Sequence, residues 1–244
     1  MADKQLSALT AATALSIGDL FYAEQGANSR KATAQQIVDI AKGQIKPAFS
    51  EPVAADFSIS RSAGGSPSII DPPGQNGILM TTTRGASRQN SFYLKAAGVS
   101  APFTVEAGIY CQYEVDDPFW WCGIAVGDTS ANQHAYVALS SGATGVTGPV
   151  VTNGYLSSLT AVETDSTGIA GVTKHSYGLI KLVVSATEIK GYWSPDGDGR
   201  HWHLLSTITI AGKFTNGVTT VGFYEGYVAS TGTNKMWCPH FSVY

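Results

Sequence analysis

From about residue 76 onward, apolar and polar residues follow a pattern that is typical of β-strands. Runs rich in Val, Ile, Tyr, Phe and Thr recur, and clusters of Gly, Asn, Asp and Pro separate them. Side chains of the first kind suit a pleated sheet, and those of the second kind suit turns. No apolar repeat of helical period extends over a useful length in this region. The pattern therefore predicts an antiparallel β-sandwich or barrel over residues 76–244.

A first hairpin is predicted from residues 103–115 and 119–126, with a turn at 115–118. Centring the pairing on that turn places Cys111 opposite Cys122 on an apolar face. Because side chains alternate along a strand, the other face carries a mixed aromatic and polar set. That set consists of Tyr110, Gln112, Glu114 and Trp121.

A second hairpin is predicted from residues 180–184 and 189–193, with the turn at 185–188. In this register Ile180, Leu182 and Val184 face Trp193, Gly191 and Ile189 on the inner side. A slip of one residue would turn both inner sets to water, so the register is well specified. The last strand ends on an alternation that predicts inward positions for Trp237, Phe241 and Val243.

The N-terminal part of the chain has a different pattern. Leu20–Glu24 and Ser29–Ala32 are predicted as a short hairpin, and a helix is predicted to begin at Thr33 and to stop at Gly43. A helix of about ten residues is too short to be stable alone in water. It must dock on its own hairpin, on a sister chain or on another protein, and the sequence leaves these alternatives open.

Composition changes near residue 46 and suggests three parts. Residues 1–45 form a docking module, residues 46–75 a linker and irregular lead-in, and residues 76–244 the β-sandwich. The middle part is rich in Ser, Ala and Gly and contains Pro47, Pro52, Pro67, Pro72 and Pro73. Such composition is typical of connecting segments.

Charge and length exclude several classes of function. Charged residues make up 14% of the 244 residues, with a net charge of −3, and roughly 25% is usual for soluble domains. No basic run exists beyond Arg30-Lys31, which argues against nucleic-acid binding. No apolar stretch is long enough to span a bilayer, and the N-terminus lacks the plan of a secretion signal. We therefore expect a chain made in a cytoplasm, with free rather than disulfide-bonded cysteines.

Candidate catalytic and metal-binding residues have simpler structural explanations. Glu114 and Asp116 begin an acidic motif of jelly-roll glycosidases, but the second glutamate is missing and Pro118 ends the strand. We therefore expect no enzymatic activity and no cofactor. Asp196 and Asp198 are weak calcium candidates in a turn that is too short for an EF-hand loop. A zinc site would require His201 and His203 to be joined by Cys238 and His240, and their spacing does not support it.

Trp121 and its predicted neighbours suggest a sugar-binding surface. Aromatic rings flanked by amide and carboxylate groups suit a sugar, because its C–H face stacks while its hydroxyls form hydrogen bonds. The candidate glycan-binding residues are thus Tyr110, Gln112, Glu114 and Trp121. The alternative is that this face packs against the linker, another subunit or residues 1–45.

Two resemblances add to this interpretation. The order Tyr177-Gly-Leu-Ile-Lys-Leu-Val-Val, Ile189-Lys-Gly-Tyr-Trp-Ser-Pro-Asp-Gly, His201-Trp and Val221-Gly-Phe resembles the second half of concanavalin A-like (laminin-G-like) jelly rolls. This resemblance covers roughly residues 57–244. It implies a mainly β fold, an antiparallel sandwich of the jelly-roll type. The small hairpin-plus-helix module predicted above from the residue pattern precedes this sandwich.

The second resemblance concerns the N-terminus. Leu6-Ser-Ala-Leu-Thr-Ala-Ala-Thr, Gly18-Asp-Leu-Phe-Tyr and Ser29-Arg-Lys-Ala-Thr-Ala-Gln-Gln-Ile resemble N-terminal modules of tailed-bacteriophage virion proteins. In tail fibres, head fibres and baseplate-associated proteins such modules attach the subunit to the particle. The resemblance implies a virion location and other virion subunits as partners, with a trimer as the commonest assembly. The docking candidates are Leu20, Tyr22, Arg30, Ile37 and Ile40.

Together these expectations describe a non-enzymatic phage structural protein that displays a lectin-like sandwich for adhesion to a host-surface glycan. A first alternative is a purely architectural role, in which the sandwich cements or decorates neighbouring capsid or tail subunits. A second alternative is a carbohydrate-active enzyme on the same fold. Binding by many copies on one particle would compensate for weak single-site contacts.

Overall fold

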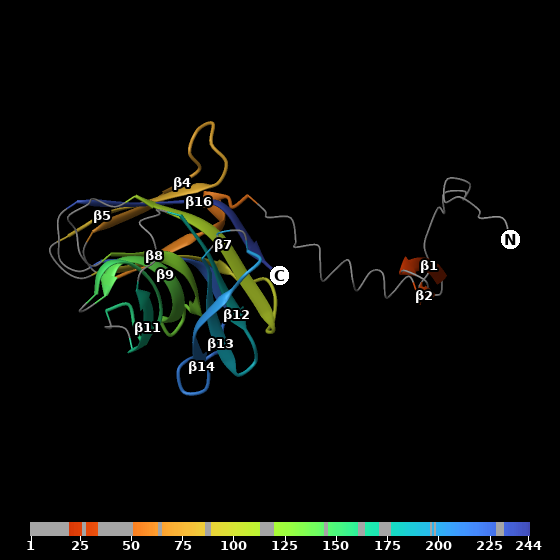
Figure 1. Ribbon diagram of the computed structural model, residues 1–244. Coiled ribbons are helices and arrows are strands. Elements are labelled where there is room, and N and C mark those ends of the chain that lie inside the picture. The colour runs from red at the N-terminus through yellow and green to blue at the C-terminus, as the bar shows by residue number, and fades with distance from the viewer. Residues whose placement is uncertain are drawn as a thin grey trace. The chain divides into compact units, whose positions relative to one another are not determined.

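The computed structural model describes residues 20–25, 28–33, 51–62, 65–85, 89–112, 120–143, 146–160, 164–170, 177–195, 197, 199–227 and 232–244. The chain divides into two compact units, Met1–Ala48 and Phe49–Tyr244. The first unit contains a β-hairpin, and the second contains two seven-stranded sheets (Figure 1). Among the described residues, no helix is long and apolar enough to cross a bilayer.

The hairpin of the first unit pairs β1 (Leu20–Gln25) with β2 (Asn28–Thr33) in antiparallel fashion. This confirms the two predicted strands to within one residue at each end. The helix predicted after Thr33 lies outside the described residues. A two-stranded hairpin is at best marginally stable in water, so this hairpin needs further contacts to persist.

One sheet of the sandwich, here called the β7 sheet, has the strand order β14-β13-β12-β7-β16-β5-β4. Each neighbouring pair is antiparallel. Its strands are β4 (Ser66–Ile70), β5 (Ile78–Thr83), β7 (Phe103–Gln112), β12 (Tyr177–Val184), β13 (Glu188–Ser194), β14 (His203–Thr209) and β16 (Thr233–Val243).

The other sheet, here called the β8 sheet, has the order β11-β10-β9-β8-β15-β6-β3, and its pairs are also antiparallel. A 3₁₀ helix, η2 (Ala54–Asp56), precedes its first strand. Its strands are β3 (Ser58–Arg61), β6 (Gln89–Ala96), β8 (Trp120–Asp128), β9 (Gln133–Ala143), β10 (Val146–Leu156), β11 (Thr164–Ala170) and β15 (Thr220–Tyr227).

The core lies between the two sheets. Alternate residues of each central strand point into it, as Ile109 and Cys111 do on β7 and Cys122 and Ile124 do on β8. These side chains are at most 1% exposed, so each strand contributes one dry face. The predicted antiparallel β-sandwich is confirmed.

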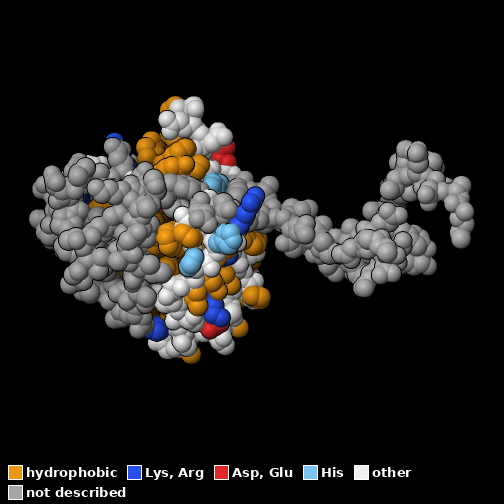
Figure 2. Space-filling model, in the orientation of Figure 1, with side chains coloured by type: hydrophobic (Ala, Val, Ile, Leu, Met, Phe, Trp, Pro, Cys, Tyr) orange, Lys and Arg blue, Asp and Glu red, His pale blue; other side chains and the backbone are white. Residues whose placement is uncertain are grey.

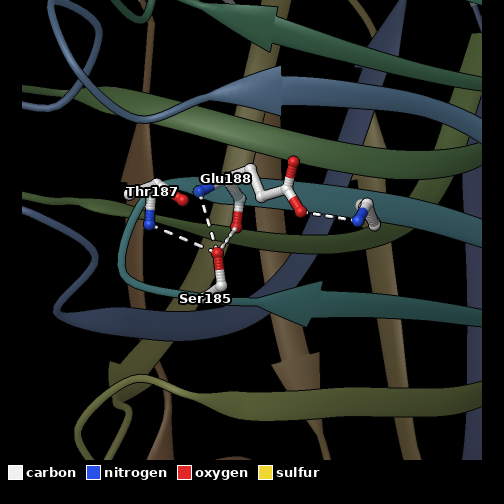
Figure 3. Close-up of polar contacts among 4 residues, drawn as sticks. Ser185, Thr187 and Glu188 are labelled. Atoms are coloured by element: carbon white, nitrogen blue, oxygen red, sulfur yellow. Dashed lines mark hydrogen bonds and ion pairs between the residues drawn. The ribbon is translucent and has the colours of Figure 1, made fainter.

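The second predicted hairpin is confirmed in its register. β12 pairs with β13 so that Ile180 lies opposite Trp193 and Val184 opposite Ile189. Ser185 organises the turn, because its Oγ accepts hydrogen bonds from the backbone N–H groups of Thr187 and Glu188 at 3.2 and 3.0 Å (Figure 3). A serine that bonds to the backbone two and three residues later is a common device in tight turns.

The first predicted hairpin is wrong. β7 pairs with β12 and β16 in one sheet, whereas β8 pairs with β9 and β15 in the other. The alternation correctly identified the inward residues of both strands, and Cys111 and Cys122 are both in the core. An inward pattern is equally satisfied by two strands that face each other across the sandwich, so it could not determine which strands pair.

The segment 46–75 differs from the predicted linker and irregular lead-in. It contains β3 at the edge of the β8 sheet and β4 at the edge of the β7 sheet. One of its prolines, Pro67, is compatible with an edge strand, where a missing backbone donor costs little. Pro67 lies in β4, which has a pairing partner on one side only.

The last strand also differs from the prediction at one residue. Phe241 points inward and Val243 packs against the core, but Trp237 is only half-buried and lies on the outer face beside Tyr110. The pairing of β16 with β7 shifts between Trp237 and His240. One extra residue at this bulge reverses the alternation, so Cys238 and Phe241 both point inward although they are three residues apart.

Candidate functional site

The two sheets place the predicted sugar-binding residues on opposite sides of the sandwich. Tyr110 lies between two inward residues of β7, so its side chain is on the outer face of the β7 sheet, where it is 38% exposed. Trp121 lies between two inward residues of β8, on the outer face of the β8 sheet. The predicted platform is therefore wrong as a set. The side chain of Gln112 and the whole of Glu114 lie outside the described residues.

Tyr110 instead belongs to a continuous row of apolar side chains across four strands of the β7 sheet. Tyr110 lies opposite Trp237, Trp237 opposite Leu79, and Leu79 opposite Ile70. Side chains directly opposite one another share a face. Since neighbouring strands are about 4.8 Å apart, this Tyr110 row spans about 14 Å.

The row is ordered and accessible. The rings of Tyr110 and Trp237 stack with their centroids 5.1 Å apart and an angle of 27° between their planes. Trp237 Nε1 donates a hydrogen bond to the backbone carbonyl of Asn76 at 2.9 Å, which fixes the indole. Ile70 is 48% exposed, and Trp237 and Leu79 are half-buried. A fixed and partly accessible aromatic pair with apolar neighbours is suited to contact the C–H face of a sugar.

Polar side chains flank the row on one side. Lys235 and Thr81 lie opposite each other, two residues along their strands from Trp237 and Leu79 and on the same face. Ser68 continues this line on β4, and its hydroxyl donates to the backbone carbonyl of Thr81 at 3.4 Å. Lys235 is exposed to solvent, so an ammonium group and hydroxyl groups are available about 7 Å from the aromatic pair.

Charged side chains lie on the other side of the row. Glu106 is buried and accepts a hydrogen bond from the Tyr244 hydroxyl at 3.0 Å. Burial, together with the charge of Glu106, raises the pKa of Tyr244, so this hydroxyl stays protonated and donates. Lys181 lies opposite Glu106 in the sheet. Its Nζ is 3.8 Å from the ring centroid of Trp202 and 5.2 Å from that of Tyr192, within range of a cation–π attraction.

Figure 2 shows one face of the molecule. Hydrophobic side chains form several patches on the described part of this face, whereas histidine and acidic side chains occupy only small areas.

Trp121 has a packing role rather than an exposed one. It is 6% exposed and belongs to a second buried cluster on the outer face of the β8 sheet, together with Phe92, Leu94, Ala125, Tyr136, Ala138, Leu156 and Tyr224. Glycines make room for the rings, because a Cβ atom at Gly226 would lie 2.3 Å from the Tyr224 hydroxyl oxygen. The alternative from the sequence was that this face packs against the linker, another subunit or residues 1–45, whereas the cluster that buries Trp121 consists of side chains of its own sheet.

His134 lies beside this cluster and is fully buried. Its ring stacks on Phe92 with 3.9 Å between centroids. Burial lowers its pKa to about 4, although the charge of Asp128 acts in the opposite direction. Neither ring nitrogen has a hydrogen-bond partner among the residues that the structure describes. The imidazole is therefore neutral at pH 7.

A buried carboxyl group inside the sandwich was not predicted from the sequence. Glu225 Oε2 accepts hydrogen bonds from the hydroxyls of Thr82 at 2.5 Å and Tyr93 at 2.6 Å. Burial raises the pKa of Glu225 to about 7, and these two hydrogen bonds act in the opposite direction. The available signal was its place in β15, where Val221, Phe223 and Glu225 alternate toward the core.

The metal candidates gain no support. Asp196 and Asp198 lie outside the described residues. His203 begins β14 and His201 precedes it, and both are exposed. Cys238 Sγ donates to the backbone carbonyl of His240 at 3.0 Å. Within the described ranges, no group of three or more His, Cys, Asp or Glu side chains could hold a metal ion.

The docking candidates are only partly described. Leu20 and Tyr22 lie in β1 and Arg30 in β2, where Arg30 is opposite Ala23. Ile37 and Ile40 lie outside the described residues. That these residues dock on a larger assembly stays a prediction.

Comparisons with known proteins identify the fold. The sequence matches no protein-family model and no curated protein. A functionally unknown protein from Saccharomyces cerevisiae shares the architecture with a TM-score of 0.54 and 13% identity, over 79% of this chain and 98% of that one. A glycosyl hydrolase family protein from Mycobacterium fortuitum gives 0.47 and 12%, over 82% and 96%.

A xylan β-1,4-xylosidase from Bacillus halodurans gives a TM-score of 0.49 and 14% identity, over 68% of this chain and 32% of that one. The chain thus spans about a third of that protein. Likeness at this level of identity shows the β-sandwich fold alone. The expectation that the chain is not an enzyme does not stand, because a β-sandwich fold gives no ground for that exclusion.

Proposed function

We propose that this protein binds carbohydrate through the Tyr110 row on the outer face of the β7 sheet. The observation that carries the proposal is the stacked pair of Tyr110 and Trp237, which is fixed by the hydrogen bond to Asn76 and still accessible. A sugar would place its C–H face against these rings. Its hydroxyls would meet Lys235 and Thr81 along the neighbouring line of the sheet.

The length and shape of the Tyr110 row indicate which kind of carbohydrate it can bind. Four opposed residues give a strip about 14 Å long, which suits an extended segment of glycan better than a single sugar ring. The strip is shallow, because it lies on an open sheet face. Individual contacts are then weak, and high affinity requires several copies of the chain acting together.

A glycan array with the full chain tests this function. We expect binding by the wild type, loss of at least tenfold in apparent affinity on Trp237→Ala, and a smaller loss on Tyr110→Ala. Tyr110→Phe keeps the ring and should bind almost as well as the wild type. Val99→Ala is the matched control, because Val99 is an exposed apolar residue outside the strands. Equal binding by Trp237→Ala and the control would contradict the proposal.

We propose further that the N-terminal unit attaches the sandwich to a bacteriophage particle, as part of a homo-oligomer that is most simply a trimer. The support is the resemblance of residues 5–43 to virion-attachment modules, and the division of the chain after Ala48. The experiment is mass spectrometry of purified particles that carry either the full chain or a chain lacking residues 1–45. Retention of the shortened chain on the particle would contradict the proposal.

Hydrolysis of the bound glycan is a second candidate function. Glu106 favours it, because this buried carboxyl group lies on the same face as the Tyr110 row and is held by Tyr244. Glycoside hydrolysis usually needs a pair of carboxyl groups, and Glu106 would supply one of them. Release of reducing ends from the glycans that bind, abolished by Glu106→Gln while binding persists, would establish it. If the wild type releases no reducing ends, hydrolysis is excluded for these glycans and carbohydrate binding is the only function supported.

A further inference from the structure

Two cysteines from opposite sheets meet inside the sandwich. Cys111 is the last described inward residue of β7, and Cys122 is an inward residue of β8. Each is 1% exposed, and the two side chains are near enough to interact, because Cys111 is among the causes that raise the pKa of Cys122. Both are free thiols in the structure. Because β7 and β8 are not paired, this contact joins the two layers of the fold.

The surroundings of the pair are specific. In the β7 sheet Cys111 lies opposite Met236, and in the β8 sheet Cys122 lies opposite Glu225. The third cysteine, Cys238, is two residues beyond Met236 and donates to a backbone carbonyl of its own strand. The two thiols that face each other across the sandwich are thus Cys111 and Cys122.

We propose that Cys111 and Cys122 are a modification site, at which a disulfide bond locks the two sheets together when the chain folds in an oxidising medium. β-sandwiches accommodate such a bond, as the inter-sheet disulfide of immunoglobulin domains shows. The sulfur atoms need to approach to about 2.05 Å. The bond would close a ring from residue 111 to residue 122, which contains the connection between the two sheets.

The chemistry balances with a small-molecule disulfide, such as oxidised glutathione, as the oxidant. The thiolate of one cysteine attacks the glutathione disulfide and releases one glutathione thiolate. The second cysteine then attacks the mixed disulfide and releases the other. The two protons lost by the cysteines end on the two glutathione molecules, so the protein is oxidised by two electrons and the glutathione disulfide is reduced by two.

Burial makes this reaction slow in the folded chain. Burial, and to a lesser extent the neighbouring Cys111, raises the pKa of Cys122, so little thiolate is present near neutral pH. The folded chain therefore stays reduced in a reducing compartment. Oxidation requires folding, or transient opening of this end of the sandwich, in the presence of the oxidant.

The test uses the full chain with Cys238→Ser, which leaves only the two cysteines in question. The chain is unfolded under reducing conditions and refolded in a mixture of reduced and oxidised glutathione. We expect an intact mass lower by two hydrogen atoms, a cross-linked peptide joining residues 111 and 122, and a midpoint of thermal unfolding about 5–10 °C above that of the reduced chain.

Two controls keep the outcome decisive. The wild type refolded in the same way should give the same cross-linked peptide, which covers the case in which Cys238→Ser fails to fold. Cys111→Ser should show neither the mass loss nor the rise in the unfolding midpoint. A folded chain with free thiols, with glutathione attached to single cysteines, or with a lower unfolding midpoint after oxidation would overturn the proposal.

Discussion

At the scale of single residues, we expect buried His134 to make the folded protein less stable at acidic pH. Its folded-state pKa is about 4 against 6.5 for a free histidine. The unfolded chain therefore binds an additional proton between these two values, and stability falls as pH drops from 6.5 toward 4. The gap between the two pKa values corresponds to about 3 kcal/mol of unfolding free energy.

Urea unfolding at pH 7 and pH 4.5 measures this effect. Between pH 7 and pH 4.5, we expect the wild type to lose more unfolding free energy than the variant His134→Gln loses. The two losses should differ by about 2–3 kcal/mol. Equal losses in the two proteins would show that His134 is not held neutral by burial.

Glu225 has the opposite effect on the pH dependence of stability. Its pKa is raised from 4.5 to about 7 in the folded state, so the folded chain retains a proton that the unfolded chain has lost. The associated stability is fully present below pH 4.5 and is lost as pH rises through 7. Gln keeps an oxygen that can accept hydrogen bonds from Thr82 and Tyr93, but it carries no charge. Glu225→Gln should therefore be as stable as the wild type near pH 4.5.

At pH 8 the same variant should be more stable than the wild type by about 3 kcal/mol. Guanidinium unfolding of both proteins at pH 4.5 and 8 checks this. A variant that is less stable than the wild type at both pH values would mean that the carboxylate is satisfied in the core.

At the scale of strands, the sequence predicted which residues face inward better than which strands pair. Alternation identified the inner residues of β7, β8 and β12 because burial of one face imposes a period of two. It could not assign β7 and β8 to different sheets, since both arrangements bury the same residues. It also failed at Trp237, where a bulge reversed the alternation. The Tyr110 row depends on pairings between distant strands, so it was not accessible from local pattern.

Close packing between central strands gives a further prediction. A Cβ atom at Gly222 of β15 would lie 1.9 Å from the backbone carbonyl oxygen of Tyr93 on β6. A backbone atom in a paired strand cannot move away cheaply, so Gly222→Ala should destabilise the protein by about 3 kcal/mol. Chemical denaturation measures this loss, with Thr220→Ala on the same strand as the control. Equal losses for the two variants would contradict this close approach of the strands.

At the scale of the whole molecule, the chain divides after Ala48. If the sandwich folds independently, a chain lacking residues 1–48 should unfold at the same temperature and with the same cooperativity as the sandwich transition of the full chain. Differential scanning calorimetry of both proteins tests this. A markedly lower midpoint for the shortened chain would show that the N-terminal unit supports the sandwich.

The fold class followed from the sequence, but function did not follow from the fold. Val, Ile and aromatic runs separated by turn residues were sufficient to predict a β-sandwich. The same architecture occurs in a functionally unknown protein from Saccharomyces cerevisiae. Because one fold can carry many functions, activity has to be argued from side chains on a particular face. Here that face is the outer side of the β7 sheet.

The most direct test is a crystal structure of the full chain with the glycan that binds best on the array. A sugar ring packed against Tyr110 and Trp237, with a hydroxyl or charged group near Lys235, is the result expected from the accessible row. Sugar density on the outer face of the β8 sheet, beside Trp121 and Tyr224, would instead place the site on the opposite side of the sandwich and contradict the assignment.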